Sequence, residues 1–126
     1  MDKLEYIQGD LVKFATNTYT IVNFEENFLH NKICYALIST NSTKTVFVAD
    51  RDILPIPLTT EILEKNGWEH KDDVYFKEYP HRKLVVMDGN AYIINESCSL
   101  FLCKAEFVHE LQHLLYALHI DSNLKI

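Results

Sequence analysis

The stretch HELQH at residues 109–113 is the part of this chain whose residue types and spacing match a known catalytic pattern. In zinc peptidases with this pattern, two histidines one helical turn apart bind the metal and the glutamate acts as general base. His119 lies six residues after the second histidine, where one class of these enzymes has its third ligand. The pattern therefore suggests, as an alternative function, a minimal zinc-dependent peptidase with His109, His113 and His119 as zinc ligands and Glu110 as the base.

Two features of the sequence argue against that peptidase. Enzymes with the third histidine carry a glycine that ends the helix before it, whereas Tyr116 occupies the corresponding position here. They also have a methionine turn downstream, but the methionines of this chain, Met1 and Met87, both precede the motif. We therefore expect no catalytic residue, no metal ligand and no bound cofactor, and Glu110 is a base only in the alternative.

The motif lies in a helix that we predict from Lys104 to about Ile120. At a helical advance of about 100° per residue, its apolar side chains form one stripe that can seat the helix on a core: Phe107, Val108, Leu111, Leu114, Leu115 and Leu118. His109 and His113 fall nearly opposite the middle of that stripe. We expect both rings on an exposed, solvated face, beside Glu110 and Gln112.

The composition predicts a folded, acidic protein. Its 126 residues include 18 Asp or Glu and 12 Lys or Arg, which gives a formal net charge of −6. Because proteins that bind phosphate backbones need a cluster of Lys and Arg, nucleic acid is disfavoured as a partner. The first ten residues carry no apolar signal segment, and no apolar run has the length of a membrane span, so we expect a cytoplasmic protein with no membrane partner.

The cysteines do not predict a disulfide framework, because Cys34, Cys98 and Cys103 are odd in number. Cys98 and Cys103 precede His109 and His113 in the spacing C-x4-C-x5-H-x3-H. A zinc finger needs about a dozen residues between its two pairs, so that a hairpin can fold back onto the helix. Packed, unbridged thiols are the expectation.

Residues 1–57 predict a small β-rich subdomain. Short β-branched and aromatic segments alternate with turn residues, and strands are expected at residues 11–14, 18–24, 33–39, 45–49 and 53–56. The polar segments at residues 25–32 and 41–44 are predicted as turns. Four or five short strands in this length favour a small barrel-like, SH3-like subdomain, and an open meander also fits the spacing.

Residues 58–126 predict an α+β subdomain after a junction stiffened by Pro55 and Pro57. A short helix should begin after Thr59 as N-cap and end at Gly67, with Trp68 folding back on the helix. Three or four antiparallel strands follow, at residues 74–79, 83–87, 91–94 and, more weakly, 99–102, before the C-terminal helix. Asp88-Gly89 is a strong hairpin signal.

Three segments of the chain resemble a family of small proteins common in phages and prophages of gut and related bacteria. They are IPLT at residues 56–59, EILEKNGW at residues 61–68 and VHELQH at residues 108–113. The resemblance covers the second half of the chain well and the first half only through Gly9-Asp10, and it implies no particular activity. Such proteins often carry Gln at the position of Glu110 and Asn at that of His113. His109 and Gln112 match the family, either as a shared partner surface or as a structural cap.

These observations favour a non-enzymatic accessory protein of a phage or other mobile element. We expect it to act by protein–protein interaction with a host or phage protein, because the chain is acidic, compactly patterned and without a complete catalytic constellation. The possible partner surface includes His109 and Gln112.

Overall fold

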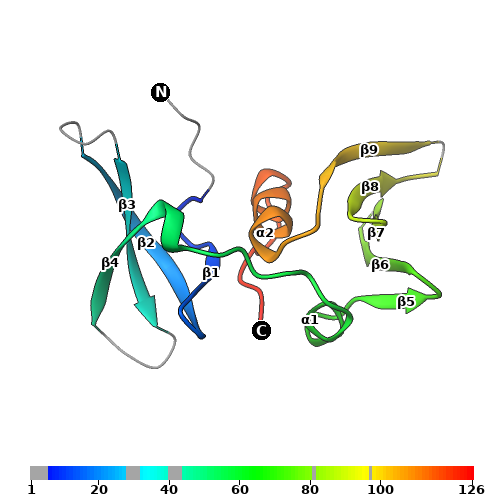
Figure 1. The fold of residues 1–126 in the computed structure, drawn as a ribbon. Helices are drawn as coiled ribbons and strands as arrows, with labels where there is room; N and C mark the ends of the chain where they lie inside the picture. The colour runs from blue at the N-terminus through cyan, green and yellow to red at the C-terminus, as the bar shows by residue number, and fades with distance from the viewer. Residues whose placement is uncertain (1–5, 28–31, 40–43, 81, 97) are drawn as a thin grey trace. The chain divides into compact units, whose positions relative to one another are not determined.

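The computed structural model describes residues 6–27, 32–39, 44–80, 82–96 and 98–126 (Figure 1). The chain forms two compact units, Met1–Ile56 and Pro57–Ile126, where the sequence suggested a boundary after residue 57. Each unit has its own antiparallel sheet, and the two α-helices belong to the second unit. The described chain is therefore an α+β protein dominated by strands.

The first unit is a four-stranded sheet in the order β1-β2-β3-β4. Its strands are β1 (Leu11–Phe14), β2 (Asn17–Asn27), β3 (Lys32–Ser39) and β4 (Thr45–Ala49). One face buries an apolar cluster of Tyr6, Val12, Ile21, Tyr35, Leu37, Val48 and Ile53. The turn predicted at residues 25–32 is partly wrong, because β2 continues to Asn27. Residues 28–31 and 41–43, where turns were predicted, lie outside the described residues.

The expected strand at residues 53–56 is replaced by a 3-10 turn and a single bridge. The turn η1 spans Asp50–Asp52, and Leu54 then pairs antiparallel with Lys13 of β1. Lys13 N–H donates to Leu54 O at 2.9 Å, and Leu54 N–H donates to Lys13 O at 2.8 Å. Pro55 has no N–H to extend this ladder. In the described chain the sheet is thus not closed into a barrel.

The second unit has a five-stranded sheet in the order β5-β6-β7-β8-β9, one strand more than predicted. It contains α1 (Thr60–Lys65), β5 (Glu69–Lys71), β6 (Val74–Tyr79), β7 (Arg82–Met87), β8 (Asn90–Ile94), β9 (Ser99–Lys104) and α2 (Val108–Ala117). The β7–β8 hairpin predicted from Asp88-Gly89 is confirmed. Both residues have positive φ, 51° and 73°, as a type I′ turn requires.

The ends predicted for α1 are also confirmed. The Thr59 side chain accepts a hydrogen bond from Ile62 N–H at 3.3 Å. At the other end, Gly67 has φ of 84° and Trp68 N–H donates to Leu63 O at 3.0 Å, which together form a Schellman motif. Trp68 is 4% exposed and packs in the same cluster as Leu63.

The core of the second unit lies between one face of the sheet and both helices. Its buried members come from α1, the strands and α2: Leu63, Trp68, Leu84, Val86, Ala91, Ala105, Leu111, Leu114 and Leu115. Because side chains alternate across a strand, Val85, between Leu84 and Val86, points to the opposite side of the sheet. We call that opposite side the outer face.

Helix α2 is shorter than predicted at both ends. It begins at Val108 rather than Lys104, because β9 occupies the chain up to Lys104. It ends at Ala117, and His119 adopts a left-handed conformation with φ of 61°. His119 N–H donates to Tyr116 O and Ile120 N–H to Leu115 O, so a Schellman motif closes this helix without a glycine. No helix in the described part of the chain has the length and apolarity to cross a membrane.

Candidate functional site

The prediction that His109 and Gln112 lie on a solvated face of the C-terminal helix is wrong. Both side chains are 4% exposed. The His109 ring stacks on Phe107, with ring centroids 6.0 Å apart and planes 18° apart. Gln112 Nε2 donates to Ser122 O at 3.2 Å and so fastens the segment after the helix to the helix itself. With so little exposed area, neither residue offers a surface to a partner. The sequence left two roles open for this pair, a partner surface or a structural cap, and Gln112 has the structural one.

Glu110, the base of the peptidase alternative, caps the helix that carries it. Its Oε1 accepts hydrogen bonds from the backbone N–H of Glu106 at 2.9 Å and of Phe107 at 3.1 Å. Glu110 is the third residue of α2, the position from which a glutamate reaches back to the N-cap. Its negative charge also lies at the positive end of the helix dipole. One of its two carboxylate oxygens, Oε1, thus caps the N-terminus of α2 by accepting from two amides.

The three candidate metal ligands are not arranged as a site. The rings of His109 and His113 lie edge to face, with centroids 5.6 Å apart and planes 78° apart. His119 is exposed and sits in the turn beyond the helix. Within the described residues, no group of three or more His, Cys, Asp or Glu side chains is placed to hold a metal ion. The residues present therefore do not fit the zinc centre that the motif suggested.

The Cys103 thiol lacks the environment that activates a nucleophile. All three cysteines are unbridged, and Cys98 is exposed while Cys103 is partly buried against the core. Burial, and to a lesser degree the charge of Glu110, raise the pKa of the Cys103 thiol above its ordinary value of 9.0. A nucleophilic cysteine needs the opposite shift.

The sequence did not predict that Asn66 ties the end of α1 to the backbone near the C-terminus. Asn66 Nδ2 donates to Lys125 O, and Lys125 N–H donates back to Asn66 Oδ1, both at 2.8 Å. The same amide nitrogen donates to Ile62 O at 2.7 Å and caps α1. The position of Asn66 before Gly67 signals a helix C-cap, but a bond to a residue 59 positions later leaves no local pattern.

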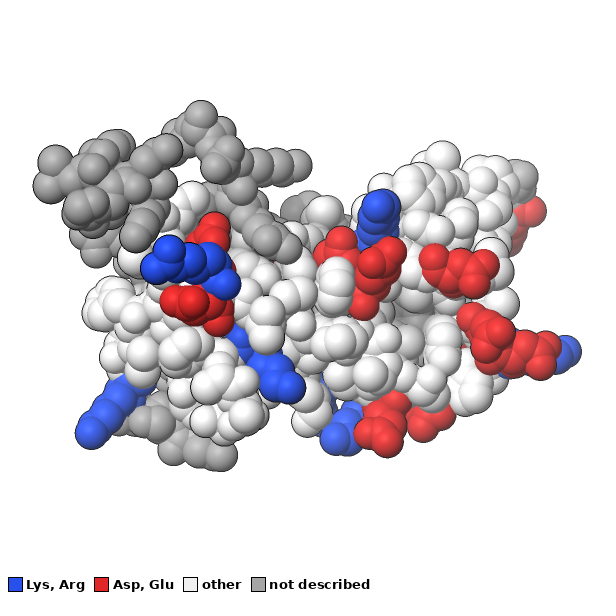
Figure 2. All heavy atoms as spheres, viewed as in Figure 1, with Lys and Arg blue, Asp and Glu red and all other residues white. Residues whose placement is uncertain are grey.

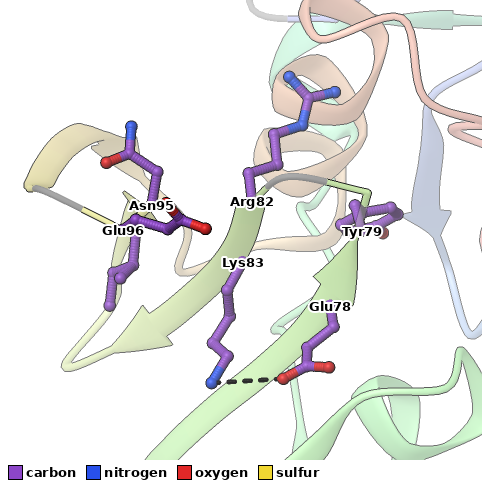
Figure 3. Close-up of a pocket in the computed structure, with 7 residues that line it drawn as sticks. Glu78, Tyr79, Arg82, Lys83, Asn95 and Glu96 are labelled. Carbon is purple, nitrogen blue, oxygen red and sulfur yellow. Dashed lines mark ion pairs between the residues drawn. The ribbon is translucent and has the colours of Figure 1, made fainter.

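An open cavity of about 540 Å³ lies at the end of β6 and β7 (Figure 3). Lys83 Nζ is directed at Glu78 Oε1, 3.5 Å away, and Arg82 Nη2 donates to Leu118 O at 3.3 Å. Burial raises the pKa of the Tyr79 hydroxyl there, and the nearby Arg82 charge partly offsets that rise. Glu96 adds a second carboxylate to the wall. The side chains of Lys83 and Arg82 already have acceptors. The described lining includes no serine or cysteine that could act as a nucleophile.

The outer face of the second unit's sheet carries a row of apolar side chains. Strand registers place Phe76, Val85, Tyr92 and Phe101 side by side across four strands. The rings of Tyr92 and Phe101 meet edge to face at 5.7 Å, and Lys83 Nζ lies 5.1 Å from the centre of the Phe76 ring. We call these four residues the central row.

Within the central row Val85 is buried and Phe76 and Tyr92 are partly buried, so the exposed apolar side chains lie at its β9 end and on either side of it. Phe101 is 53% exposed, and Met87 and Ile94 on either side of the row are each 36% exposed. The helices of the unit pack on the other side of the sheet. On the side of the molecule visible in Figure 2, basic side chains are scattered rather than clustered, and acidic ones recur over the second unit. The outer face thus combines exposed apolar side chains with the Lys83–Glu78 ion pair, which suits a protein surface better than a phosphate backbone.

No family model, no curated protein and no solved structure matches this chain.

Proposed function

We propose that this chain is a non-enzymatic accessory protein of a phage or other mobile element that acts by binding a host or phage protein. The observation that carries the proposal is the outer face, where Met87, Ile94 and Phe101 remain exposed while both helices pack on the opposite side of the sheet. Exposed apolar strips rimmed by polar residues are characteristic of protein-binding surfaces. The origin from a mobile element rests on the resemblance of residues 56–59, 61–68 and 108–113 to phage proteins.

Two finer features belong to the same proposal. The first unit is a minimal SH3-like module, since its 3-10 turn follows β4 and Leu54 then returns to pair with Lys13 of β1. The protein acts in the cytoplasm, and its three unbridged cysteines suit that reducing compartment. The motif at residues 109–113 supports this non-enzymatic role through Glu110 and Gln112, which bind backbone groups.

The experiment is a comparison of captured proteins between matched surface variants. The whole chain, the Met87→Asp variant and the Phe47→Asp variant are immobilised and exposed to lysate of a bacterial host, and retained proteins are quantified by mass spectrometry. Met87 is on the outer face, whereas Phe47 is a 68% exposed apolar residue of the first unit. A charge in an apolar interface costs several kcal/mol, so Met87→Asp should lose the partner.

The control separates the outer face from general stickiness. Phe47→Asp removes more exposed apolar surface than Met87→Asp, so it should lower non-specific background and retain the partner. Circular dichroism must show both variants folded. Capture of no specific protein, or equal capture by all three proteins, refutes binding through the outer face.

A further inference from the structure

We propose that Asn66-Gly67 is a site of spontaneous deamidation, and that the segment at residues 121–126 keeps this site closed in the folded chain. Asparagine is a chemically labile residue. It reacts most readily before glycine, because glycine has no side chain to shield its backbone nitrogen. Asn66-Gly67 is the one Asn-Gly step in the 126 residues of the sequence. The structure joins Asn66 to residues 121–126 through Lys125.

The reaction needs only these two residues and water. The backbone nitrogen of Gly67 attacks Cγ of Asn66 and gives up its proton as the new N–Cγ bond forms. The Cγ–Nδ2 bond breaks, and Nδ2 leaves with that proton as ammonia, so that a five-membered succinimide ring remains. Water then opens the ring at one of its two carbonyl carbons. Attack at Cγ gives aspartate, and attack at the main-chain carbonyl carbon gives isoaspartate, whose backbone is longer by one methylene.

The folded backbone holds the attacking nitrogen away from Cγ. Asn66 has a ψ of 17°, which nearly eclipses the nitrogen of Gly67 with the nitrogen of Asn66 itself. Cβ occupies another tetrahedral position of the same Cα, so Cγ can meet the Gly67 nitrogen only after rotation about the Cα–C bond. The peptide is held at both ends against that rotation. Gly67 N–H donates to Glu64 O at 3.1 Å, and Lys77 Nζ donates to Asn66 O at 2.7 Å.

The side chain of Asn66 is held as well. Its Nδ2 donates to Ile62 O at 2.7 Å and to Lys125 O at 2.8 Å, and its Oδ1 accepts from Lys125 N–H at 2.8 Å. Two of these three bonds come from Lys125, which is exposed and lies in a segment without helix or strand. Segments with exposed backbone hydrogen bonds open at a lower free energy than a core does. The opening of residues 121–126 therefore controls how often Cγ is free to react.

The reaction makes the opening permanent. An aspartate at position 66 has no Nδ2 hydrogens, so it cannot donate to the two carbonyl oxygens that Asn66 binds, and its negative charge faces them. An isoaspartate shifts Gly67 by one methylene relative to α1, which separates Trp68 N–H from Leu63 O, 3.0 Å away in the unreacted chain. A molecule that has reacted does not recover the closed segment. The reacted fraction of a sample thus measures how long its molecules have spent open.

Rates of deamidation in the folded and the unfolded chain test the protection. The whole chain is incubated in mildly alkaline buffer with and without guanidinium chloride, and peptide mapping by mass spectrometry follows the replacement of NH2 by OH at Asn66. Five hydrogen bonds restrain the site, and each corresponds to about a fivefold change in an equilibrium. Deamidation should therefore be at least about a hundredfold slower in the folded chain. No deamidation in guanidinium chloride, or equal rates in the two conditions, overturns the proposal.

Two variants of Lys125 test whether residues 121–126 supply part of this protection. Lys125→Pro removes the N–H that binds Asn66 Oδ1, whereas Lys125→Ala keeps it. The alanine variant is the matched control, because both variants lose the same exposed side chain. Folded Lys125→Pro should deamidate about fivefold faster than the unmodified chain, and Lys125→Ala should match the unmodified chain. Circular dichroism must show both variants folded, and equal rates in the two variants overturn the role of the segment.

The variant Asn66→Asp tests the permanence of the change. It carries the product side chain from the start, so amide exchange at Lys125 should be about fivefold faster than in the unmodified chain. Exchange as slow as in the unmodified chain refutes the permanent release. None of these measurements involves a binding partner, so their outcome is independent of the test of the outer face.

Discussion

Removing the side chain of Glu110 should destabilise the second unit even though the residue belongs to a motif that resembles a catalytic centre. In Glu110→Ala, the N–H groups of Glu106 and Phe107 lose the oxygen that they share, at 2.9 and 3.1 Å. Loss of a helix N-terminal cap costs about 1 kcal/mol, and loss of a negative charge from the first turn about 0.5 kcal/mol. Since two amides are involved, we expect a total cost of about 2 kcal/mol.

The matched variant Glu110→Gln separates capping from charge. Gln retains an acceptor oxygen at the same reach, so it should keep most of the capping and cost about 0.5–1 kcal/mol. The free energy of unfolding is measured by urea denaturation at neutral pH, with chelator and with added zinc. Amide hydrogen exchange at Glu106 and Phe107 gives the local readout, and its protection should fall in Glu110→Ala but remain in Glu110→Gln.

Two results would refute this reasoning. The first is a Glu110→Ala protein as stable as the unmodified chain, with unchanged protection of both amides. The second is a zinc-dependent gain in stability, together with near-stoichiometric zinc that survives dialysis and is lost in His113→Asn. A ligand that binds only the folded state must raise the free energy of unfolding, so a resident zinc could not escape this measurement.

Three further outcomes follow from the second unit. Gly67→Ala places a side chain at a φ of 84° and should lower stability by about 1 kcal/mol in a denaturant titration. Asn66→Ala removes both bonds to Lys125, so amide exchange at Lys125 should accelerate while the far-UV circular dichroism stays unchanged. Burial and then the Glu110 charge raise the pKa of Cys103, so its stabilising contribution is complete below pH 9.0 and is lost as the pH rises through the raised pKa. Glu110→Gln should lower that pKa and speed alkylation of Cys103 near pH 8.

Features fixed by local chemistry were predictable from the sequence. Thr59 and Gly67 bound α1 because a side-chain acceptor and a left-handed residue are needed at its two ends. Asp88-Gly89 forms the β7–β8 turn because both of its residues tolerate positive φ. In each case the determining groups lie within a few residues of one another, so the pattern is complete in a short window.

Features that depend on distant segments were not predictable in the same way. Helical phase correctly placed Leu111 and Leu115 in the core. For His109 it predicts only on which side of the helix the ring lies, and not which residues pack against that side. The burial of Gln112 follows from Ser122 O folding back onto α2 after a turn that His119 makes without glycine. The strand β5 was missed because its three residues, Glu69–Lys71, are all exposed and carry no apolar alternation.

The same five residues can serve catalysis or capping, and what surrounds them decides which. A zinc peptidase needs both histidines to converge on a metal and the glutamate to keep an oxygen available for a proton. Here Glu110 Oε1 accepts from two amides at the start of the helix, and His119, which could supply a third ligand, lies in the left-handed turn that ends it. A Gln at position 110 would remove a general base but preserve a cap, because Glu and Gln both accept hydrogen bonds from backbone N–H groups. Retained stability in Glu110→Gln, together with its loss in Glu110→Ala, is thus expected of a helix cap and not of a general base.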